Sequence, residues 1–174
     1  MDYILLNDLQ KEGYENDILA LMQLCDKDFI PPLSARASTL QKDLSFSNAS
    51  GNVCAYFDEM IKQKVLVIID DDKFLGFVSY KENYSNDVIN KNTFPNIYVS
   101  TLMLAPESRG KHLTEHAYNH LFNTLYPKHN IYTRTWSTNL AHIRILSKFN
   151  FNELHRIKND RGDNIDTVYF EKTR

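Results

Sequence analysis

The sequence predicts an α/β fold: a mixed, mostly antiparallel central sheet flanked by helices, with one βαβ crossover. An edge strand and two helical patterns come first, three strand-like runs follow, and the chain then alternates helix, strand and helix before two final strands. Neighbouring strands pair as hairpins, whereas a strand, a helix and a strand in succession form a parallel crossover. The 174 residues fit a single domain, 1–174, and 43% hydrophobic against 24% charged residues is typical of a globular protein.

The N-terminal third is predicted to contain an edge strand and two helices. Tyr3 to Leu6 is a short apolar run suited to an edge strand. Apolar residues recur at helical spacing from Asn16 to Phe29, and Pro31-Pro32 ends that helix. A second apolar stripe predicts a helix from Val53 to Ile61, and one or two further turns are expected between Ser38 and Leu44.

The central part changes to the period of strands. Lys64 to Ile69 and Phe74 to Tyr80 predict a hairpin whose turn contains Asp70, Asp71 and Asp72. Asn83 to Asn96 is polar and rich in Asn, which predicts a long surface loop that is either a binding edge or an ordinary connection. Ile97 to Leu104 predicts the next strand, ended by Ala105-Pro106.

The C-terminal part completes the crossover and adds a hairpin. Gly110 to Leu125 has an amphipathic helical pattern and is followed by Pro127. The remaining predicted elements are a strand from Ile131 to Trp136, a helix from Asn139 to Phe149, and two strands, Phe151 to Ile157 and Asp166 to Lys172, joined by a turn from Asn159 to Asn164.

Charge and hydropathy exclude several classes of partner. Twenty Lys and Arg against 22 Asp and Glu give a net charge of −2, so no positive field attracts nucleic acid or anionic lipid. No apolar run approaches the roughly 20 residues that span a bilayer, and the N-terminus lacks the basic start of an export signal. We therefore expect a cytoplasmic protein with neither a nucleic-acid nor a membrane partner.

Three groups of reactive or metal-binding side chains have simpler interpretations. Cys25 and Cys54 each lie in an apolar helical pattern and are expected to be buried, reduced thiols. The three aspartates of the hairpin are expected to form a solvated turn. His112, His116 and His120 fall at i, i+4 and i+8 of the predicted helix, but the outer two lie about 12 Å apart along its axis and cannot share an ion. No metal is expected.

The stretch LMLAPESRGKHLT, from Leu102 to Thr114, carries the strongest chemical signal. A strand that ends just before a helix leaves backbone N–H groups without partners at the positive end of the helix dipole. Such a place binds phosphate. Arg109 and Lys111 add cationic side chains, and Gly110 allows a ligand to approach the backbone closely.

This stretch resembles the acetyl-CoA-binding segment of the GNAT superfamily of N-acetyltransferases, L-x-L-x-P-x-x-R-G-K-x-L. TWSTNLAHIRILSKFNF, from Thr135 to Phe151, is similar to the second signature of that superfamily. The predicted order of elements also fits a GNAT-like fold, in which the βαβ crossover carries the acetyl-CoA site. The resemblance therefore implies acetyl-CoA as co-substrate.

Four positions depart from the family pattern. His112 and Thr114 occupy the two positions of the phosphate loop that are usually small. Asn150 replaces the usual Gly after the last helix, where Asn is the next best residue for a left-handed cap. Leu146 aligns with the Tyr that many members use to protonate the leaving thiolate, and Leu cannot donate a proton.

The resemblance assigns roles residue by residue. The backbone of Met103 and Leu104 is expected to hold pantetheine and to direct an N–H at the thioester oxygen. Asn139 is expected to cap the last helix and to contact coenzyme A, although capping alone explains it equally well. The loop expected to cradle the pyrophosphate consists of Arg109, Gly110, Lys111, His112, Leu113 and Thr114.

Proton transfer and acceptor binding are less well defined. Ser100 and Thr101 occupy strand positions where members often carry a base, so they are expected to position a water molecule at most. Tyr118 and Tyr169 are alternative donors to the thiolate or simply packing residues. Arg36 is suited to grip an acidic acceptor, or else faces solvent beside a short helix.

The sequence thus predicts an N-acetyltransferase that acts by direct attack of a primary amine of a small molecule or peptide on the thioester. The alternative is a non-catalytic acyl-CoA-binding module of the same fold. A nucleotide-binding protein is disfavoured because the phosphate-loop pattern of nucleotide hydrolases is missing. A homodimer remains an open possibility.

Overall fold

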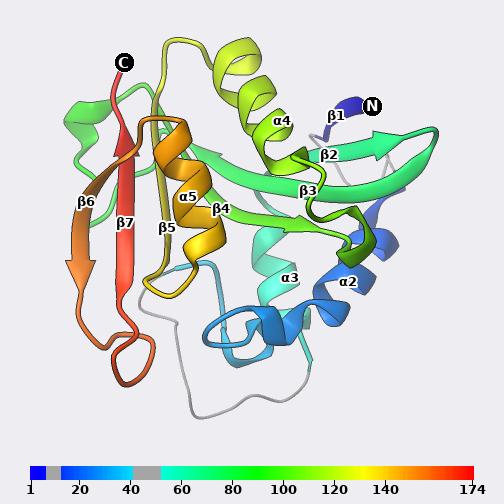
Figure 1. Cartoon of the computed structure of the whole chain (residues 1–174), viewed down its shortest axis with the longest axis horizontal. Helices are drawn as coiled ribbons and strands as arrows, with labels where there is room; N and C mark the ends of the chain where they lie inside the picture. Colours follow the sequence, from blue (N-terminus) through cyan, green and yellow to red (C-terminus); the bar gives the residue numbers. More distant parts are fainter. Residues whose placement is uncertain (7–12, 41–51) are drawn as a thin grey trace. The chain divides into compact units, whose positions relative to one another are not determined.

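The computed structural model describes residues 1–6, 13–40 and 52–174 of the chain (Figure 1). Its strands are β1 (Asp2–Leu6), β2 (Lys64–Asp70), β3 (Lys73–Glu82), β4 (Asn96–Leu104), β5 (Asn130–Trp136), β6 (Asn152–Ile157) and β7 (Thr167–Lys172). They form one sheet in the order β1-β2-β3-β4-β5-β7-β6. β4 and β5 are parallel, whereas β1 with β2, and β7 with both β5 and β6, are antiparallel. The predicted fold class is confirmed.

The helices agree with the predicted order, although several are shorter than expected. They are α2 (Glu15–Leu24), α3 (Cys54–Met60), α4 (Leu113–Asn119) and α5 (Leu140–Lys148), with 3₁₀ turns η1 (Asp26–Asp28), η2 (Leu33–Ala35), η4 (Lys91–Thr93) and η5 (Pro106–Ser108) and the π-helical segment η6 (His120–Leu125). The turns expected between Ser38 and Leu44 lie largely outside the described residues. Across the three described ranges, no helix combines the length and apolar content needed to cross a membrane.

The chain folds into two compact units. Unit 1 contains Met1–Ser79 and Thr101–Leu113, and unit 2 contains Tyr80–Ser100 and Thr114–Arg174. The units are interleaved in sequence because β3, β4 and α4 each contribute residues to both. The organisation as a single domain, 1–174, stays a prediction.

The core of unit 1 joins α2 and α3 to β1, β2 and β3. Its fully buried members include Ile18 and Met22 on α2, Tyr56 and Met60 on α3, and alternate residues of β2. The two helices therefore bury the apolar stripes that the sequence pattern showed.

The β2–β3 hairpin turns through aspartates. Asp71 and Asp72 both have positive φ, 47° and 61°, as a two-residue type I′ turn requires. Asp70 pairs instead with the N-terminal amine of Met1 at 2.9 Å. The prediction of an Asp-containing turn is confirmed.

Unit 2 contains most of the βαβ crossover and the C-terminal hairpin. β4 pairs with β5 from Asn96–Asn130 to Val99–Thr133. In Figure 1, α4 and α5 lie next to each other, and the rings of Tyr118 and Phe149 meet edge to face at 5.9 Å. Aromatic packing thus joins the two helices of unit 2.

The Asn-rich segment Asn83–Asn96 is held by hydrogen bonds from side chains to backbone. Asn96 is fully buried; its Oδ1 accepts the Tyr84 N–H at 2.9 Å and its Nδ2 donates to the Tyr84 carbonyl at 3.1 Å. Asn86 Oδ1 accepts two further amides, those of Val88 and Ile89. Ile89 in turn packs with three buried tyrosines: Tyr98, Tyr132 and Tyr169. The segment is a surface connection as predicted. Hydrogen bonds from its asparagine side chains to the backbone take the place of the backbone hydrogen bonds of a regular strand pair.

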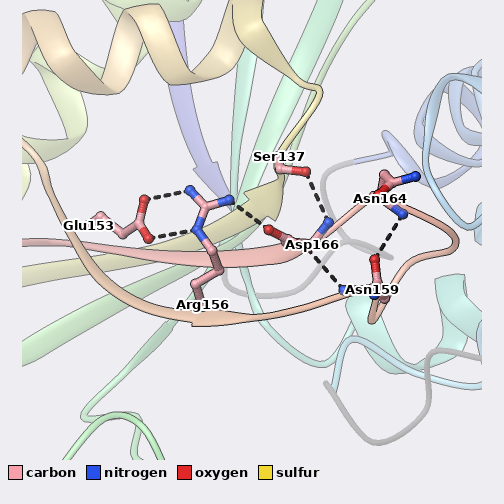
Figure 2. A network of polar contacts seen from close by, with 6 residues as sticks. All are labelled: Ser137, Glu153, Arg156, Asn159, Asn164 and Asp166. Carbon is pink, nitrogen blue, oxygen red and sulfur yellow. Dashed lines mark hydrogen bonds and ion pairs between the residues drawn. The ribbon is translucent and has the colours of Figure 1, made fainter.

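The turn between β6 and β7 is tied to the end of β5 (Figure 2). The Asp166 N–H donates to Ser137 Oγ at 2.9 Å, and the Asp166 carboxylate accepts the Asn159 N–H and Arg156 Nη1 at 3.0 and 2.9 Å. These two donors, the Asn159 amide first, lower the pKa of Asp166. Arg156 also forms a two-bond contact with Glu153. The network fixes the chain just before α5 begins.

Candidate functional site

In unit 1, the end of β4 passes unusually close to β3. A Cβ placed on Gly76 would lie 2.2 Å from the Met103 carbonyl oxygen and 2.9 Å from Leu104 Cα, and Gly76 has a φ of +155°. Only glycine permits this approach. The Ala105 N–H then donates to the Leu75 carbonyl at 2.9 Å. β3 therefore supports the backbone of Met103 and Leu104, the segment predicted to hold pantetheine.

Arg109 connects the loop after β4 to the segment after α2. Its Nη2 donates to Asp28 Oδ2 at 2.8 Å and to Cys25 Sγ at 3.1 Å, and its Nε donates to the Leu104 carbonyl at 3.3 Å. Cys25 is buried, and this burial raises the pKa of its thiol. The guanidinium predicted to lie at the mouth of a phosphate site thus contacts three protein groups.

The loop itself has left-handed backbone at two positions. Gly110 has a φ of +75° and nothing lies within 4 Å of a Cβ placed on it. His112 has a φ of +59°, a conformation that is unfavourable for most residues with a side chain. α4 begins directly afterwards, at Leu113. The predicted helix start at Gly110 is therefore wrong by three residues, because the reversal at His112 precedes the first helical turn.

The charged groups around this loop are exposed. Lys73 Nζ and Glu107 Oε1 lie 3.5 Å apart, with both side chains more than half exposed. The Glu107 backbone amide, followed by Lys73 and Lys111, lowers the pKa of Glu107. Glu107 is consequently ionised at neutral pH, and the exposed side chain of Lys111 carries a positive charge beside Gly110.

Thr101 lies in the interior of unit 1. Its side chain is 3% exposed, and its Oγ1 is 2.7 Å from the Tyr56 hydroxyl. The neighbouring Ser100, in unit 2, is partly exposed. The role of both residues in positioning water stays a prediction, and for Thr101 the hydroxyl already has a protein partner.

Asn139 is the N-cap of α5 in unit 2. Its Oδ1 accepts the His142 N–H at 3.3 Å, and its Nδ2 donates to Thr135 Oγ1 at 3.0 Å. The predicted capping role is confirmed. Contact with coenzyme A stays a prediction.

The C-terminus of α5 ends in a left-handed cap. Asn150 has a φ of +59°, its N–H donates to the Ser147 carbonyl, and the Phe151 N–H donates to the Leu146 carbonyl at 3.1 Å. These two bonds form a Schellman motif, with Leu146 and Phe151 both buried beside it. The prediction for Asn150 is confirmed.

Tyr118 and His142 form a buried polar pair between α4 and α5. The Tyr118 hydroxyl lies 2.7 Å from His142 Nε2. Burial raises the pKa of Tyr118 and lowers the pKa of His142 to about 4, so both are neutral at pH 7. The histidine tautomer then determines which of the two groups donates the hydrogen bond. Tyr169, the other predicted donor, is buried and receives a long contact from Arg134 at 3.4 Å.

Arg36 lies inside unit 1 rather than facing solvent. It is 7% exposed, and its Nε and Nη2 both donate to the Pro31 carbonyl, at 3.0 and 2.6 Å. Its guanidinium also lies over the rings of Phe29 and Tyr56, 5.5 and 5.9 Å from their centroids. The Arg36 guanidinium thus stabilises the bend of the chain that brings Pro31 next to it. The grip on an acidic acceptor stays a prediction.

Two other sequence interpretations are corrected. Cys54 is exposed rather than buried, because the inward stripe of α3 consists of Val53, Tyr56 and Met60 and leaves Cys54 on the other side. His112 precedes α4 and His120 lies in η6, so the three histidines do not share one regular helix. Within the described ranges, no three His, Cys, Asp or Glu side chains are placed to hold a metal ion.

The model of one protein family matches residues 20–151 of the chain, the acetyltransferase (GNAT) family. The match includes the loop after β4 and the whole of α5. The chain belongs to the GNAT family. Comparison with curated protein sequences gave no match.

Solved GNAT structures have the same fold at low sequence identity. An N-acetyltransferase from Staphylococcus aureus Mu50 is 15% identical, with 99% of each chain covered and a TM-score of 0.67. A ribosomal-protein-alanine N-acetyltransferase from Brucella melitensis is 13% identical, with 100% of each chain covered and a TM-score of 0.68. An aminoglycoside 6′-N-acetyltransferase in complex with coenzyme A is 14% identical, covers 99% of this chain and 97% of its own, and has a TM-score of 0.64.

Sequence reasoning missed three residues that shape the GNAT segment of unit 1. Gly76 had a visible signal, because an isolated glycine inside the strand FLGF indicates a close backbone approach. Asp28 and Cys25 had none, since their partner Arg109 lies 81 and 84 residues away along the chain.

Proposed function

We propose that this GNAT protein transfers an acetyl group from acetyl-CoA to a primary amine of a small molecule or peptide. The supporting observation is the geometry of Met103 to Leu113 in unit 1. There a strand end held against Gly76 continues into a loop with left-handed backbone at Gly110 and His112 and then into α4. This arrangement presents backbone groups at the point where the family binds its coenzyme.

The residues of the loop fit an anionic group. The space beside Gly110 is open, and the exposed Lys111 supplies a positive charge. The amides of Leu113 and Thr114, in the first turn of α4, have no carbonyl partner within the helix. We assign the diphosphate to the backbone of Arg109 to Thr114. When bound, the coenzyme supplies the acyl group as a thioester.

The protein's contribution to the reaction is positioning and charge stabilisation. The backbone of Met103 and Leu104 would hold the pantetheine arm and place an N–H beside the thioester oxygen, where negative charge develops as the amine attacks. Stabilisation of such an oxyanion by one donor is typically worth about 3 to 4 kcal/mol. Gly76 matters here because it fixes the backbone that carries this donor.

Proton transfer is assigned to water. Thr101 already contacts Tyr56, and Tyr118 already shares a hydrogen bond with His142, so neither hydroxyl is held ready for the reacting atoms. Ser100, whose side chain is partly exposed, is assigned to position this water molecule. Loss of general acid or base catalysis costs a factor of about 100 to 10,000, which leaves the larger effect of positioning intact.

A second candidate function is a non-catalytic acyl-CoA-binding module. The observation in its favour is Leu146, which is fully buried at the position where many family members carry the tyrosine acid. Both candidates require the same coenzyme site, so binding does not distinguish them.

The decisive experiment measures turnover after binding. Calorimetric titration of acetyl-CoA into the protein should give saturable heat, and release of coenzyme A should then be followed with a thiol reagent across an amine panel. The panel should include a peptide with an N-terminal alanine and an aminoglycoside, since two of the structurally similar enzymes are named for acceptors of these kinds. Release above the rate without protein supports the enzyme. Tight binding without release on any amine supports the module, and no binding overturns both.

A further inference from the structure

We infer that the Arg109 side chain is a positioning group that holds the coenzyme loop in place through Asp28 and Cys25, rather than a direct ligand of the diphosphate. This inference rests on the proposed coenzyme site. It reassigns the side chain of Arg109 and adds Asp28 and Cys25 to the residues that determine coenzyme affinity.

The contacts of Arg109 use two of its guanidinium nitrogens, Nη2 and Nε. Nη2 reaches two acceptors, Asp28 Oδ2 at 2.8 Å and Cys25 Sγ at 3.1 Å, and Nε reaches the Leu104 carbonyl at 3.3 Å. Cys25 follows α2 and Asp28 lies in η1, so one side chain links the end of α2 to the end of β4. All of these groups belong to unit 1.

The contacts of Arg109 restrain the backbone that is assigned to the pantetheine arm. Leu104 is a residue whose backbone is assigned to the pantetheine arm, and its carbonyl accepts the Arg109 Nε. Arg109 is also the residue directly before Gly110, where the left-handed turn of the loop begins. Fixing the Arg109 side chain therefore restricts both the peptide before the loop and the first bend within it.

The acceptors differ in charge and exposure. Cys25 is 1% exposed, and burial raises the pKa of its thiol, so it remains a neutral acceptor at pH 7. Asp28 supplies the negative charge, but its side chain is 51% exposed and that of Arg109 is 46% exposed. An ion pair this exposed stabilises weakly, so the effect of breaking it on coenzyme binding should be a factor of about 2 to 5.

The two possible roles of Arg109 predict changes of opposite sign. If the guanidinium binds the diphosphate, then Asp28 competes for it, and Asp28→Asn should tighten coenzyme binding by removing a negative charge. If the guanidinium positions the loop, Asp28→Asn should weaken binding by about 2- to 5-fold. Coenzyme affinity therefore distinguishes the roles without a structure of the complex.

The test is calorimetric titration of coenzyme A into the wild-type chain, three single variants and one double variant. Glu107→Gln is the matched control, because it also removes one exposed carboxylate near the loop but does not touch Arg109. Control binding should be unchanged or slightly tighter. Arg109→Gln should weaken binding, and Asp28→Asn should cause no further loss in the Arg109→Gln background, since the two act through one contact.

Each result leads to a definite conclusion. The inference is supported if Asp28→Asn weakens coenzyme binding in the wild-type chain but causes no further loss in the Arg109→Gln variant. Equal or tighter binding by Asp28→Asn overturns it. If Asp28→Asn does not fold, Cys25→Ala decides, because it removes the other acceptor of Arg109 Nη2 without changing the charge: weaker binding supports positioning, and unchanged or tighter binding overturns it. Absence of binding by the wild-type chain would instead overturn the proposed function.

Discussion

His112 and Asn150 are left-handed residues of the two GNAT signatures, but His112 lies before the start of α4 and Asn150 after the end of α5. Both replace a residue that is usually small in the family, and both have a φ of +59°. Asn150 in unit 2 closes α5: its N–H donates to the Ser147 carbonyl, and the N–H of the next residue, Phe151, donates to the Leu146 carbonyl. His112 in unit 1 lies between an open position at Gly110 and the start of α4.

The difference separates a structural use of left-handed backbone from the use that we propose in ligand binding. The Asn150 cap satisfies carbonyls of its own helix, so its conformation is determined locally. The loop at His112 depends on distant support, from Gly76 on β3 and from the contacts of Arg109. We therefore expect substitutions in the loop at His112 to affect coenzyme binding, and substitutions at the Asn150 cap to affect stability alone.

The largest expected effect is that of Gly76→Ala. The new Cβ would lie 2.2 Å from the Met103 carbonyl, so the backbone of β3 or β4 must move. Overpacking of this kind, with an added backbone strain at positive φ, should lower the free energy of unfolding by about 3 kcal/mol or more. Urea denaturation measures this change.

Gly110→Ala is the control for that substitution. Its φ is also positive, +75°, but nothing lies within 4 Å of the new Cβ, so the loss should be only about 1 kcal/mol. Coenzyme affinity should nevertheless fall in Gly110→Ala, because the methyl group occupies the space left for the ligand. Equal stability of the two variants would contradict the close approach at Gly76.

The Tyr118–His142 pair makes stability in unit 2 dependent on pH. The pKa of His142 is lowered to about 4 in the folded chain against an ordinary value near 6.5, so unfolding takes up a proton between these values. Stability should therefore fall as pH decreases from about 6.5 to about 4, by at most about 1.4 kcal/mol per pH unit. His142→Gln, which keeps an acceptor for Tyr118, should flatten this part of the profile. Parallel profiles for wild type and variant would contradict the shift.

Tyr118→Phe tests whether this tyrosine serves structure or catalysis. The substitution leaves His142 Nε2 without its hydrogen-bond partner and should cost about 1 to 2 kcal/mol of stability, measured by chemical denaturation. The turnover number of the folded variant should remain within a factor of two or three of wild type, because the hydroxyl is committed to His142. A fall in turnover of tenfold or more would instead identify Tyr118 as the acid for the thiolate.

Features set by local rules could be predicted from the sequence. The strands, the turn at Asp71 and Asp72, the cap at Asn139 and the left-handed cap at Asn150 each depend on residues within a few positions. Side-chain periodicity and turn chemistry contain this information directly. The fold class followed from their order.

Features set by distant contacts could not be predicted. The partner of Arg109 is more than 80 residues away, and the helix start was misplaced because a histidine gives no sign of left-handed backbone. The exposure of Cys54 depended on which stripe of a seven-residue helix faces the core. Arg36, expected at an acceptor pocket or in solvent, binds the Pro31 carbonyl because the chain bends beneath it.

The smallest expected effects come from restoring glycine at the two left-handed positions. In the left-handed conformation, a residue with a side chain lowers the free energy of unfolding by about 1 to 2 kcal/mol, and Asn tolerates the conformation better than His. Glycine avoids this strain, but it lowers the free energy of unfolding by about 0.5 to 1 kcal/mol because it loses more backbone entropy on folding. His112→Gly should therefore raise the free energy of unfolding by about 0.5 kcal/mol, whereas Asn150→Gly should change it by only a few tenths. Thermal denaturation of both variants against wild type measures the two shifts.

The same pair of variants also tests the division between binding and structure. His112→Gly changes the loop beside Gly110, so calorimetric titration should show altered affinity for coenzyme A, whereas Asn150→Gly should bind as wild type does. The reverse result, with altered binding only in Asn150→Gly, would place the ligand-sensitive turn at α5. In that case the contacts of Arg109 and Gly76 would serve stability alone.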